Sequence, residues 1–206
     1  MYSISREFPG FDALYYIEDP FSNRPYRGKV DGPGGYSEHE KLRLLLRGEL
    51  TVHEPIIIKH AMGGGYPTDV IWTTSGVPLI INQRVVDLLN ANKITGWSTY
   101  PVTVYTKSNE IVPDYSGLSI HGRSGPIDES KSDIVMREFP AGMFPRNKGY
   151  YFDPESWDGS DLFMAGNALH KFCSTAVKQI FTKAKVKNIE FIRMDEVEYK
   201  TLRKKE

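Results

Sequence analysis

The sequence predicts an α+β fold: one domain over residues 1–206, with a mixed or antiparallel sheet and two amphipathic helices. Three observations support this prediction. The chain has 206 residues, of which 40% are hydrophobic and 25% charged, as is typical of a globular domain. Short β-type runs are interspersed with short helical patterns. One strand–helix–strand pattern also occurs twice, and its two copies could pack as halves of one core.

Before these two copies, the pattern is a series of short elements. Leu14–Ile17 is typical of a short strand. Ser37 opens a capping-box spacing, and leucines at helical spacing follow until Gly48, which predicts a short helix. Strands are expected at Ile56–Ile58 and Val70–Trp72, and the three glycines between them favour a hairpin connection.

The first strand–helix–strand pattern runs to Tyr105. Val77–Ile81 is apolar and precedes Asn82, a favourable N-cap residue. Apolar side chains then recur at helical spacing, at Val85, Leu88 and Leu89. Gly96 supplies a turn before the extended run Trp97–Tyr105.

The same pattern occurs a second time, at an offset of 92 residues. Ser174 takes the N-cap position, Asn188 takes the place of Gly96, and Ile189–Ile192 is the final strand. Asn and Gly are the residue types that best tolerate positive φ, so the turn keeps its chemistry. We interpret the match as a duplicated strand–helix–strand unit. Coincidence is the alternative, because short amphipathic helices often precede strands.

The remaining segments alternate between strand and loop patterns. In order, the sequence predicts a half-buried strand at Leu118–His121, a turn at Gly122–Asp128, a loop at Ile134–Lys148, a short strand at Tyr150–Phe152 and an acidic loop at Asp153–Asp161. The loop at Ile134–Lys148 is expected because it contains Pro140 and Pro145. The charged tail Glu196–Glu206 is typical of a frayed helix or coil.

The balance of basic and acidic residues limits the classes of partner that we expect. Basic and acidic residues balance at 26 each, without the basic excess of a typical nucleic-acid-binding protein, so we expect no nucleic-acid partner. Locally the charge is uneven: residues 108–166 hold ten acidic and five basic residues, and residues 178–206 hold nine basic and five acidic. Two solvated surfaces are the simplest interpretation, and an acidic face that meets a basic partner is the alternative.

The cysteine count and the termini bear on the compartment. The single cysteine, Cys173, excludes an internal disulfide, and its apolar neighbours predict a buried, inert thiol. Met1–Phe8 lacks the pattern of a secretory signal, and no apolar run is long enough to span a bilayer. We therefore expect a cytoplasmic protein with no membrane partner.

No motif for nucleophilic, metal or phosphate chemistry is present, so we expect no catalytic residue, metal or cofactor. His170 precedes Cys173 by three residues, but the apolar context favours a structural thiol over a nucleophile. Arg123 could share a pocket with His121 and Asp128. An ion pair between Arg123 and Asp128 that braces the turn is the simpler interpretation.

Two motifs are more specific than the helical units. They read Gly122-Arg123-Ser124-Gly125-Pro126-Ile127-Asp128 and Trp157-Asp158-Gly159-Ser160-Asp161-Leu162-Phe163. With their surroundings, residues 75–128 and 157–197, they resemble the bacterial polymorphic-toxin immunity protein family eleven. Ser124 stands where that family often has cysteine, which argues against a thiol-based role. Residues 1–55 lie outside the resemblance and are expected to be a variable N-terminal part.

The resemblance implies a non-enzymatic protein that binds and neutralises a cognate bacterial toxin encoded next to it. An aromatic anchor with a polar rim is typical of such interfaces. The expected partner-binding residues are Trp157, Asp153, Asp158 and Asp161, with Arg123 and Asp128. The alternative is that Trp157 packs into the core of its own chain, as most tryptophans do.

Two other function classes stay open. A small-molecule-binding or enzymatic domain would have its site near His121 and Arg123, in a deep polar pocket with perturbed titrating groups. A plain protein-interaction module in a larger assembly is the third interpretation. The sequence predicts no oligomeric state.

Overall fold

The computed structural model describes residues 1–5, 14–17, 38–63, 67–73, 79–166 and 168–200. These residues form three α-helices and fifteen strands in three sheets, so the predicted α+β class is confirmed. The helices are α1 (Glu38–Leu46), α2 (Gln83–Ala91) and α3 (Thr175–Lys183), and none of them is long and apolar enough to cross a membrane. The predicted core with two helices is thus incomplete, because α1 is a third helix, which the leucine pattern before Gly48 indicates. The expected capping residue of α1, Ser37, lies outside the described residues.

The largest sheet has the strand order β2-β3-β6-β8-β5-β4, and β7 pairs with the end of β6. Its strands are β2 (Leu14–Ile17), β3 (Ile56–Met62), β4 (Val70–Trp72), β5 (Leu79–Asn82), β6 (Trp97–Tyr105), β7 (Ile111–Val112) and β8 (Tyr115–Ile120). A second sheet has the order β14-β1-β13-β12-β9, and a third has the order β10-β11-β15. Their strands are β1 (Tyr2–Ser5), β9 (Gly122–Ser124), β10 (Asp133–Phe139), β11 (Gly142–Lys148), β12 (Leu162–Ala165), β13 (Lys171–Cys173), β14 (Glu190–Arg193) and β15 (Glu198–Tyr199).

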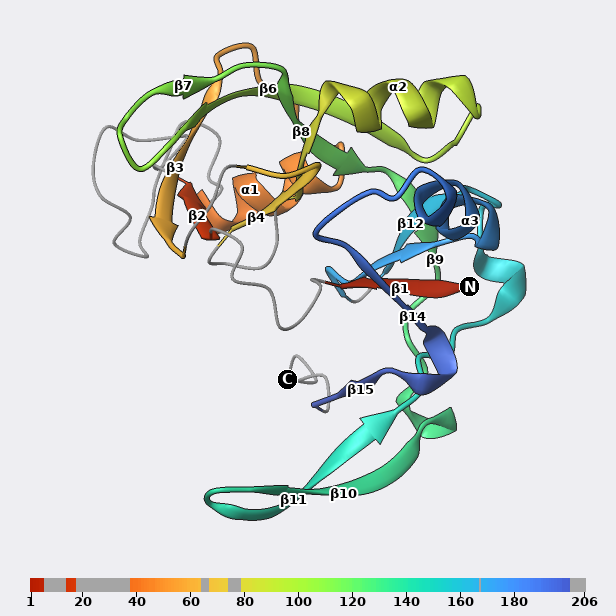
Figure 1. Cartoon of the computed structure of the whole chain (residues 1–206). Coiled ribbons are helices and arrows are strands. Elements are labelled where there is room, and N and C mark those ends of the chain that lie inside the picture. Colours follow the sequence, from red (N-terminus) through yellow and green to blue (C-terminus); the bar gives the residue numbers. More distant parts are fainter. Residues whose placement is uncertain (6–13, 18–37, 64–66, 74–78, 167, 201–206) are drawn as a thin grey trace.

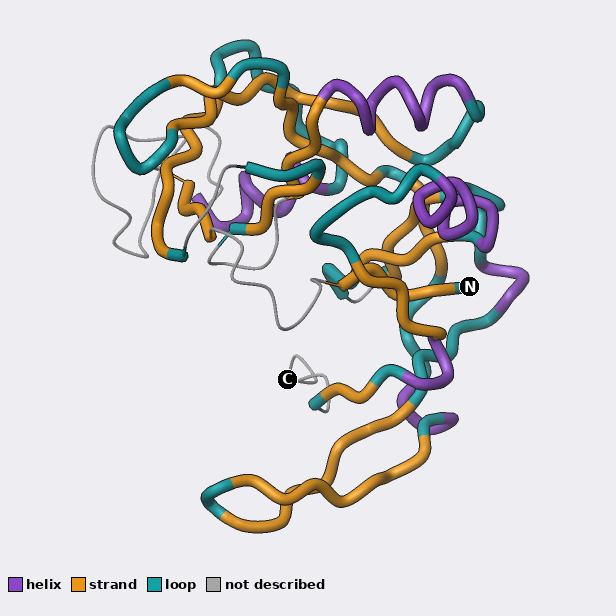
Figure 2. The backbone as a smooth tube through the Cα atoms, viewed as in Figure 1, coloured by secondary structure: helices purple, strands orange, loops and turns teal. Residues whose placement is uncertain are grey.

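The large sheet is covered on both faces (Figures 1 and 2). Because side chains alternate along a strand, Ile80 of β5 packs with Leu45 of α1, whereas Leu79 and Ile81 pack on the opposite face with α2. β8 lies in the middle of this sheet. The predicted strand is confirmed over Leu118–Ile120, but the expectation that only one of its faces is buried is wrong. Both faces are covered, and Ser119 on the α1 side donates a hydrogen bond to the Leu45 carbonyl (2.6 Å).

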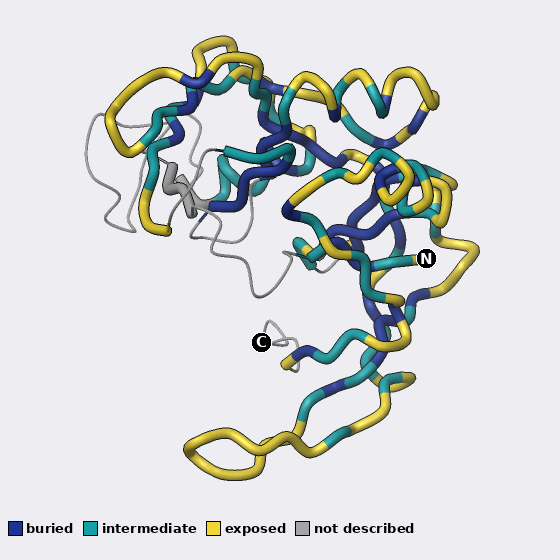
Figure 3. Tube along the Cα trace, in the orientation of Figure 1, coloured by how far each residue is buried: buried dark blue, intermediate teal, exposed yellow. Residues whose placement is uncertain are grey.

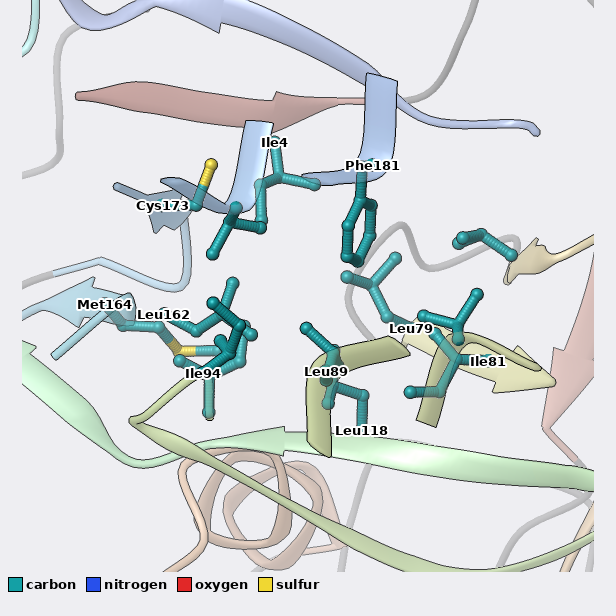
Figure 4. Packing of buried hydrophobic residues seen from close by; sticks show 14 of the residues in the cluster. Ile4, Leu79, Ile81, Leu89, Ile94, Leu118, Leu162, Met164, Cys173 and Phe181 are labelled. Atoms are coloured by element: carbon teal, nitrogen blue, oxygen red, sulfur yellow. The ribbon is translucent and has the colours of Figure 1, made fainter. Parts of the chain in front are cut away.

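The two predicted strand–helix–strand segments lie on opposite sides of one apolar core. Figure 4 shows the ring of Phe181 from α3 pointing toward Leu89 of α2, and Leu162 and Cys173 of the second sheet belong to the same cluster as these two and Ile81 of the large sheet. All five side chains are at most 5% exposed. This shared core joins the large sheet to the second sheet.

The strand registers of the two segments match at the offset of 92 residues. β4 and β5 pair with Val70 opposite Ile81, and β12 and β13 pair with Leu162 opposite Cys173. Each helix then leads to a third strand, which returns beside an antiparallel strand from elsewhere in the chain. That inserted strand is β8 in the large sheet and β1 in the second sheet.

The turns after the two helices match as well. Lys93 and Gly96 have φ values of 54° and 85° after α2, and Lys185 and Asn188 have φ values of 52° and 62° after α3. Both N-caps form as expected, since the side chains of Asn82 and Ser174 each accept a hydrogen bond from the backbone three residues later. The common origin of the two segments stays a prediction.

Several local predictions are wrong. Gly122–Ser124 is a strand parallel to β12 and not part of a turn. Tyr150–Phe152 is not a strand: Tyr150 donates its backbone N–H to Met194, and its ring packs in the core below β12. In the tail, Glu198–Tyr199 forms β15 on β11. The expected glycine hairpin is also absent, because β3 and β4 lie at different places in the sheet; Gly64 and Gly65 lie outside the described residues.

Candidate binding surfaces

Arg123 lies on β9, where the chain passes from the large sheet into the second sheet. Its guanidinium donates hydrogen bonds to the carbonyls of Ile120 (2.7 Å), Gly122 (2.8 Å) and Arg47 (2.6 Å), and it pairs with Glu49 (3.1 Å). Burial and the nearby Arg47 charge lower the pKa of Arg123, although Glu49 opposes them. Since three of these acceptors are backbone carbonyls, the side chain fixes the turn after α1 to the junction of the two sheets.

The predicted ion pair between Arg123 and Asp128 is wrong. Asp128 caps a short 3-10 helix, where its carboxylate accepts hydrogen bonds from the backbone and hydroxyl of Ser130 and lies 3.4 Å from the Lys131 ammonium. Asp153 does the same for the next 3-10 helix, accepting from the Glu155 backbone (3.1 Å). Both carboxylates thus serve turns that are local in sequence.

Trp157 is half-buried and packs on its own chain. Its ring lies 5.7 Å from that of Phe163, and its Nε1 donates to the Ser160 carbonyl (3.1 Å). Asp158 beside it accepts hydrogen bonds from the backbone N–H groups of Arg123 (2.7 Å) and Ser160 (2.9 Å). Burial by itself raises the pKa of Asp158, but these hydrogen bonds outweigh it, so the pKa lies below its ordinary value.

Asp161 joins the two matched segments. Its carboxylate accepts hydrogen bonds from Ser174, the N-cap of α3, and from the backbone N–H of Thr95 in the turn after α2. Asp69, 92 residues earlier, makes the reciprocal contacts: it accepts from Asn82, the N-cap of α2, and from the backbone N–H of Lys187 in the turn after α3. These two carboxylates cross-link the halves of the shared core.

The structure therefore brings Arg123, Trp157, Asp158 and Asp161 to one region, at β9 and the loop before β12, where their polar groups serve internal contacts. Asp153 and Asp158 retain exposed surface. A partner-binding role for these residues stays a prediction.

His121 and Arg123 both lie beside the turn after α1. His121 is exposed, and its Cβ lies 3.1 Å from the point at which a side chain on Gly48 would begin. Three surface hollows of about 390, 460 and 670 Å³ lie elsewhere, and neither residue lines them. A polar pocket at His121 and Arg123 therefore stays a prediction.

The described residues contain no cluster of three or more His, Cys, Asp or Glu side chains suited to a metal ion. Cys173 is buried in the shared core, and burial raises the pKa of its thiol to about 12. The thiol is thus held in its unreactive form at neutral pH.

The segment 134–148 is a β-hairpin, and the expectation of a loop is wrong. β10 and β11 pair without interruption from Asp133 opposite Lys148 to Phe139 opposite Gly142. Pro145 lies opposite Met136 and is tolerated because only two residues of β11 pair with a third strand. The signal that could have predicted this hairpin is the Pro-Ala-Gly turn between two extended runs, in which Gly142 has a φ of 116°.

This hairpin carries most of the exposed large apolar side chains among the described residues. They are Ile134, Met136, Phe139, Met143 and Phe144, between 43% and 72% exposed. The hairpin projects away from the two larger sheets (Figure 3). Apolar side chains gathered on a projecting element are typical of an interaction surface.

A comparison with protein families places most of the chain in one family model. A family model described as Immunity protein family (Imm11) matches residues 12–196, most of the 206-residue chain. The matched range includes both motifs on which the resemblance was based. It also covers most of residues 1–55, where the sequence alone showed no resemblance to the family. A search of curated proteins found no match.

Proposed function

The chain belongs to the Imm11 immunity protein family, and from this membership we propose that it binds and neutralises a cognate bacterial toxin without chemical turnover. The family match over residues 12–196 is the observation that carries the proposal. The toxin is the product of a neighbouring gene in a polymorphic toxin system, and the complex forms in the cytoplasm. Stoichiometric binding suffices to block a toxin, because occupying its active site stops its reaction.

The way in which the motif residues are used supports a binding role over an enzymatic one. Arg123 is engaged with backbone carbonyls and Glu49, and Asp158 and Asp161 accept hydrogen bonds from the backbone. A general acid or base must reach the proton that it transfers, and a nucleophile must reach its substrate. The family motifs thus stabilise a framework that presents other surfaces to a partner.

The acidic loop between Asp153 and Asp161 overlaps the second motif and still presents exposed carboxylates to a partner. We keep its exposed carboxylates, Asp153 and Asp158, as proposed rim contacts. Trp157 and Asp161 are less suitable for testing this surface, since their replacement would also disturb packing and the link between the two segments. Asp153→Asn tests the rim with the smallest change in shape, and unchanged affinity for the toxin would remove this position from the interface.

The two matched segments are proposed to be copies of one duplicated unit within a single domain of residues 1–206. Their common strand registers, their matching positive-φ turns and the reciprocal contacts of Asp69 and Asp161 support this origin. Because the two copies share one core, neither is expected to fold alone. Expression of residues 157–206 without the rest of the chain should yield an unfolded peptide.

The direct test is co-expression with the product of the neighbouring toxin gene. The tagged chain is expected to restore growth and to co-purify with the toxin in a stable, stoichiometric complex. A matched control is an unrelated toxin of the same activity, which the chain should not neutralise. Absence of both rescue and complex would contradict the proposal.

A further inference from the structure

The β10–β11 hairpin has one attachment to the rest of the described chain through its strands. β11 pairs with β15 only at Asn147 and Lys148, and β10 pairs only with β11. A two-stranded hairpin is marginally stable by itself in water. Its persistence as an arm that projects from the molecule therefore requires support on one of its faces (Figure 1).

The strand register divides the hairpin into two faces, because residues directly opposite each other point to the same side. One face, here called the supported face, carries Val135, Arg137, Phe139, Phe144 and Arg146. The other, here called the open face, carries Ile134, Met136, Glu138, Met143 and Pro145.

The supported face is stabilised by contacts within the hairpin and with β15. The rings of Phe139 and Phe144 meet edge to face at 6.0 Å. The Arg137 guanidinium forms a two-pronged ion pair with Glu198 of β15, with one bond of 2.7 Å from Nε. These contacts hold the arm in place, and they involve no residue of the open face.

The open face is apolar and exposed. Ile134, Met136 and Met143 are 72%, 52% and 55% exposed. Glu138 lies among them, opposite Met143, and is itself exposed, with no ion pair among the described residues. Three large apolar side chains around one carboxylate form a compact patch with a single negative charge.

This charge decides between a second copy of the chain and a different partner. The open face carries no Lys, Arg or His, so two copies packed through it would bury two Glu138 carboxylates without a cation. Burial of an unpaired carboxylate is strongly unfavourable. A partner that brings a cation to this position, within an apolar surface, removes that cost.

We propose that the open face of the β10–β11 hairpin inserts into an apolar cleft of the cognate toxin, where a basic side chain of the toxin pairs with Glu138. This inference rests on the proposed function and adds a second contact surface to the acidic loop proposed there. The two flexible methionines suit such a cleft because they adapt to irregular surfaces. The rigid edge-to-face pair on the supported face keeps the arm extended for insertion.

The test measures the affinity of purified variants for the product of the neighbouring toxin gene. The triple variant Ile134→Ser, Met136→Ser, Met143→Ser should weaken binding at least about 100-fold, and Glu138→Gln about 10-fold. The association rate of the wild-type chain should also fall more steeply with salt than that of Glu138→Gln. All variants should keep the wild-type melting temperature, since the replaced side chains are exposed.

A matched control replaces exposed apolar side chains elsewhere: Met62→Ser with Ile111→Ser, at 58% and 61% exposure in the wild type. Unchanged affinity in this control is expected. If the wild type binds and the triple variant binds equally well, the hairpin inference is wrong while the proposed function stands. If the wild type neither binds nor rescues growth, both are wrong. A dimer of the free chain that the triple variant abolishes would assign the open face to a second copy instead.

Discussion

Replacement of Asp69 by alanine should destabilise the fold by about 2–3 kcal/mol, because it removes one of the two links between the matched segments. The carboxylate accepts hydrogen bonds from the Asn82 side chain (3.0 Å), from the backbone N–H of Lys187 (2.9 Å) and from Arg84 (2.8 Å). Arg84 is 51% exposed and adds little. The other two bonds to a charged, partly buried acceptor are worth about 1–1.5 kcal/mol each.

The assay is urea unfolding followed by tryptophan fluorescence, with the free energy of unfolding taken from the midpoint and slope. Asp87→Ala is the control: this exposed carboxylate on α2 accepts a hydrogen bond from Gln83 one turn away and from no other described residue, and its loss should cost about 0.5 kcal/mol or less. The free energy of unfolding of Asp69→Asn should lie between those of Asp69→Ala and Asp87→Ala, since the amide retains one acceptor oxygen. Equal stability of Asp69→Ala and Asp87→Ala would refute the reasoning that the reciprocal contacts hold the segments together.

Three further predictions concern the same framework. Arg123→Met should lower the free energy of unfolding by about 2–4 kcal/mol in urea, because three carbonyls lose their donor, while exposed Arg193→Met should leave the midpoint unchanged. Cys173 should resist thiol labelling at pH 8 in the native state and react fully in urea; fast native labelling would contradict its burial. The pKa values of Asp69 and Asp158 lie below their ordinary value of 3.8, so their contribution to stability should be present above pH about 4 and lost as the pH falls through the lower folded values. Urea midpoints between pH 7 and pH 3 should show this loss, and a flat profile would argue against it.

The elements that sequence reasoning predicts correctly are those whose signals are local. Asn82 and Ser174 cap their helices through a bond to a residue three positions away, and Gly96 and Asn188 adopt positive φ by their own chemistry. The same locality explains how the α+β class and the order of the matched segments could be read without a structure. Caps, periodicity and turn residues act within one or two turns of the chain.

The features that the sequence does not predict depend on contacts between distant residues. The N-terminal strand β1 lies inside the second sheet, between β13 and the edge strand β14, and no periodicity in Tyr2–Ser5 indicates this place. Arg123 finds its partners 74 and 76 residues away, at Glu49 and Arg47, so its pairing with nearby Asp128 was the wrong inference from spacing.

The hairpin was missed for a different reason. Prolines usually argue against a strand because they lack the N–H that pairing requires. Pro145 escapes this limit because the outer edge of β11 is unpaired at that position. Edge position is a property of the assembled sheet, and so the exposed apolar surface of the hairpin could be recognised only in the structure.

The central claim is that this chain neutralises its toxin by stoichiometric binding. The most direct test is a titration of purified chain against a fixed amount of the neighbouring gene's toxin, with residual toxin activity measured at each ratio. The account predicts a linear fall in activity that ends at a fixed stoichiometric ratio, with the complex recovered intact. Loss of activity at a small fraction of one equivalent, with a toxin that stays inactive after the chain is removed, would indicate an enzymatic antidote and contradict the account.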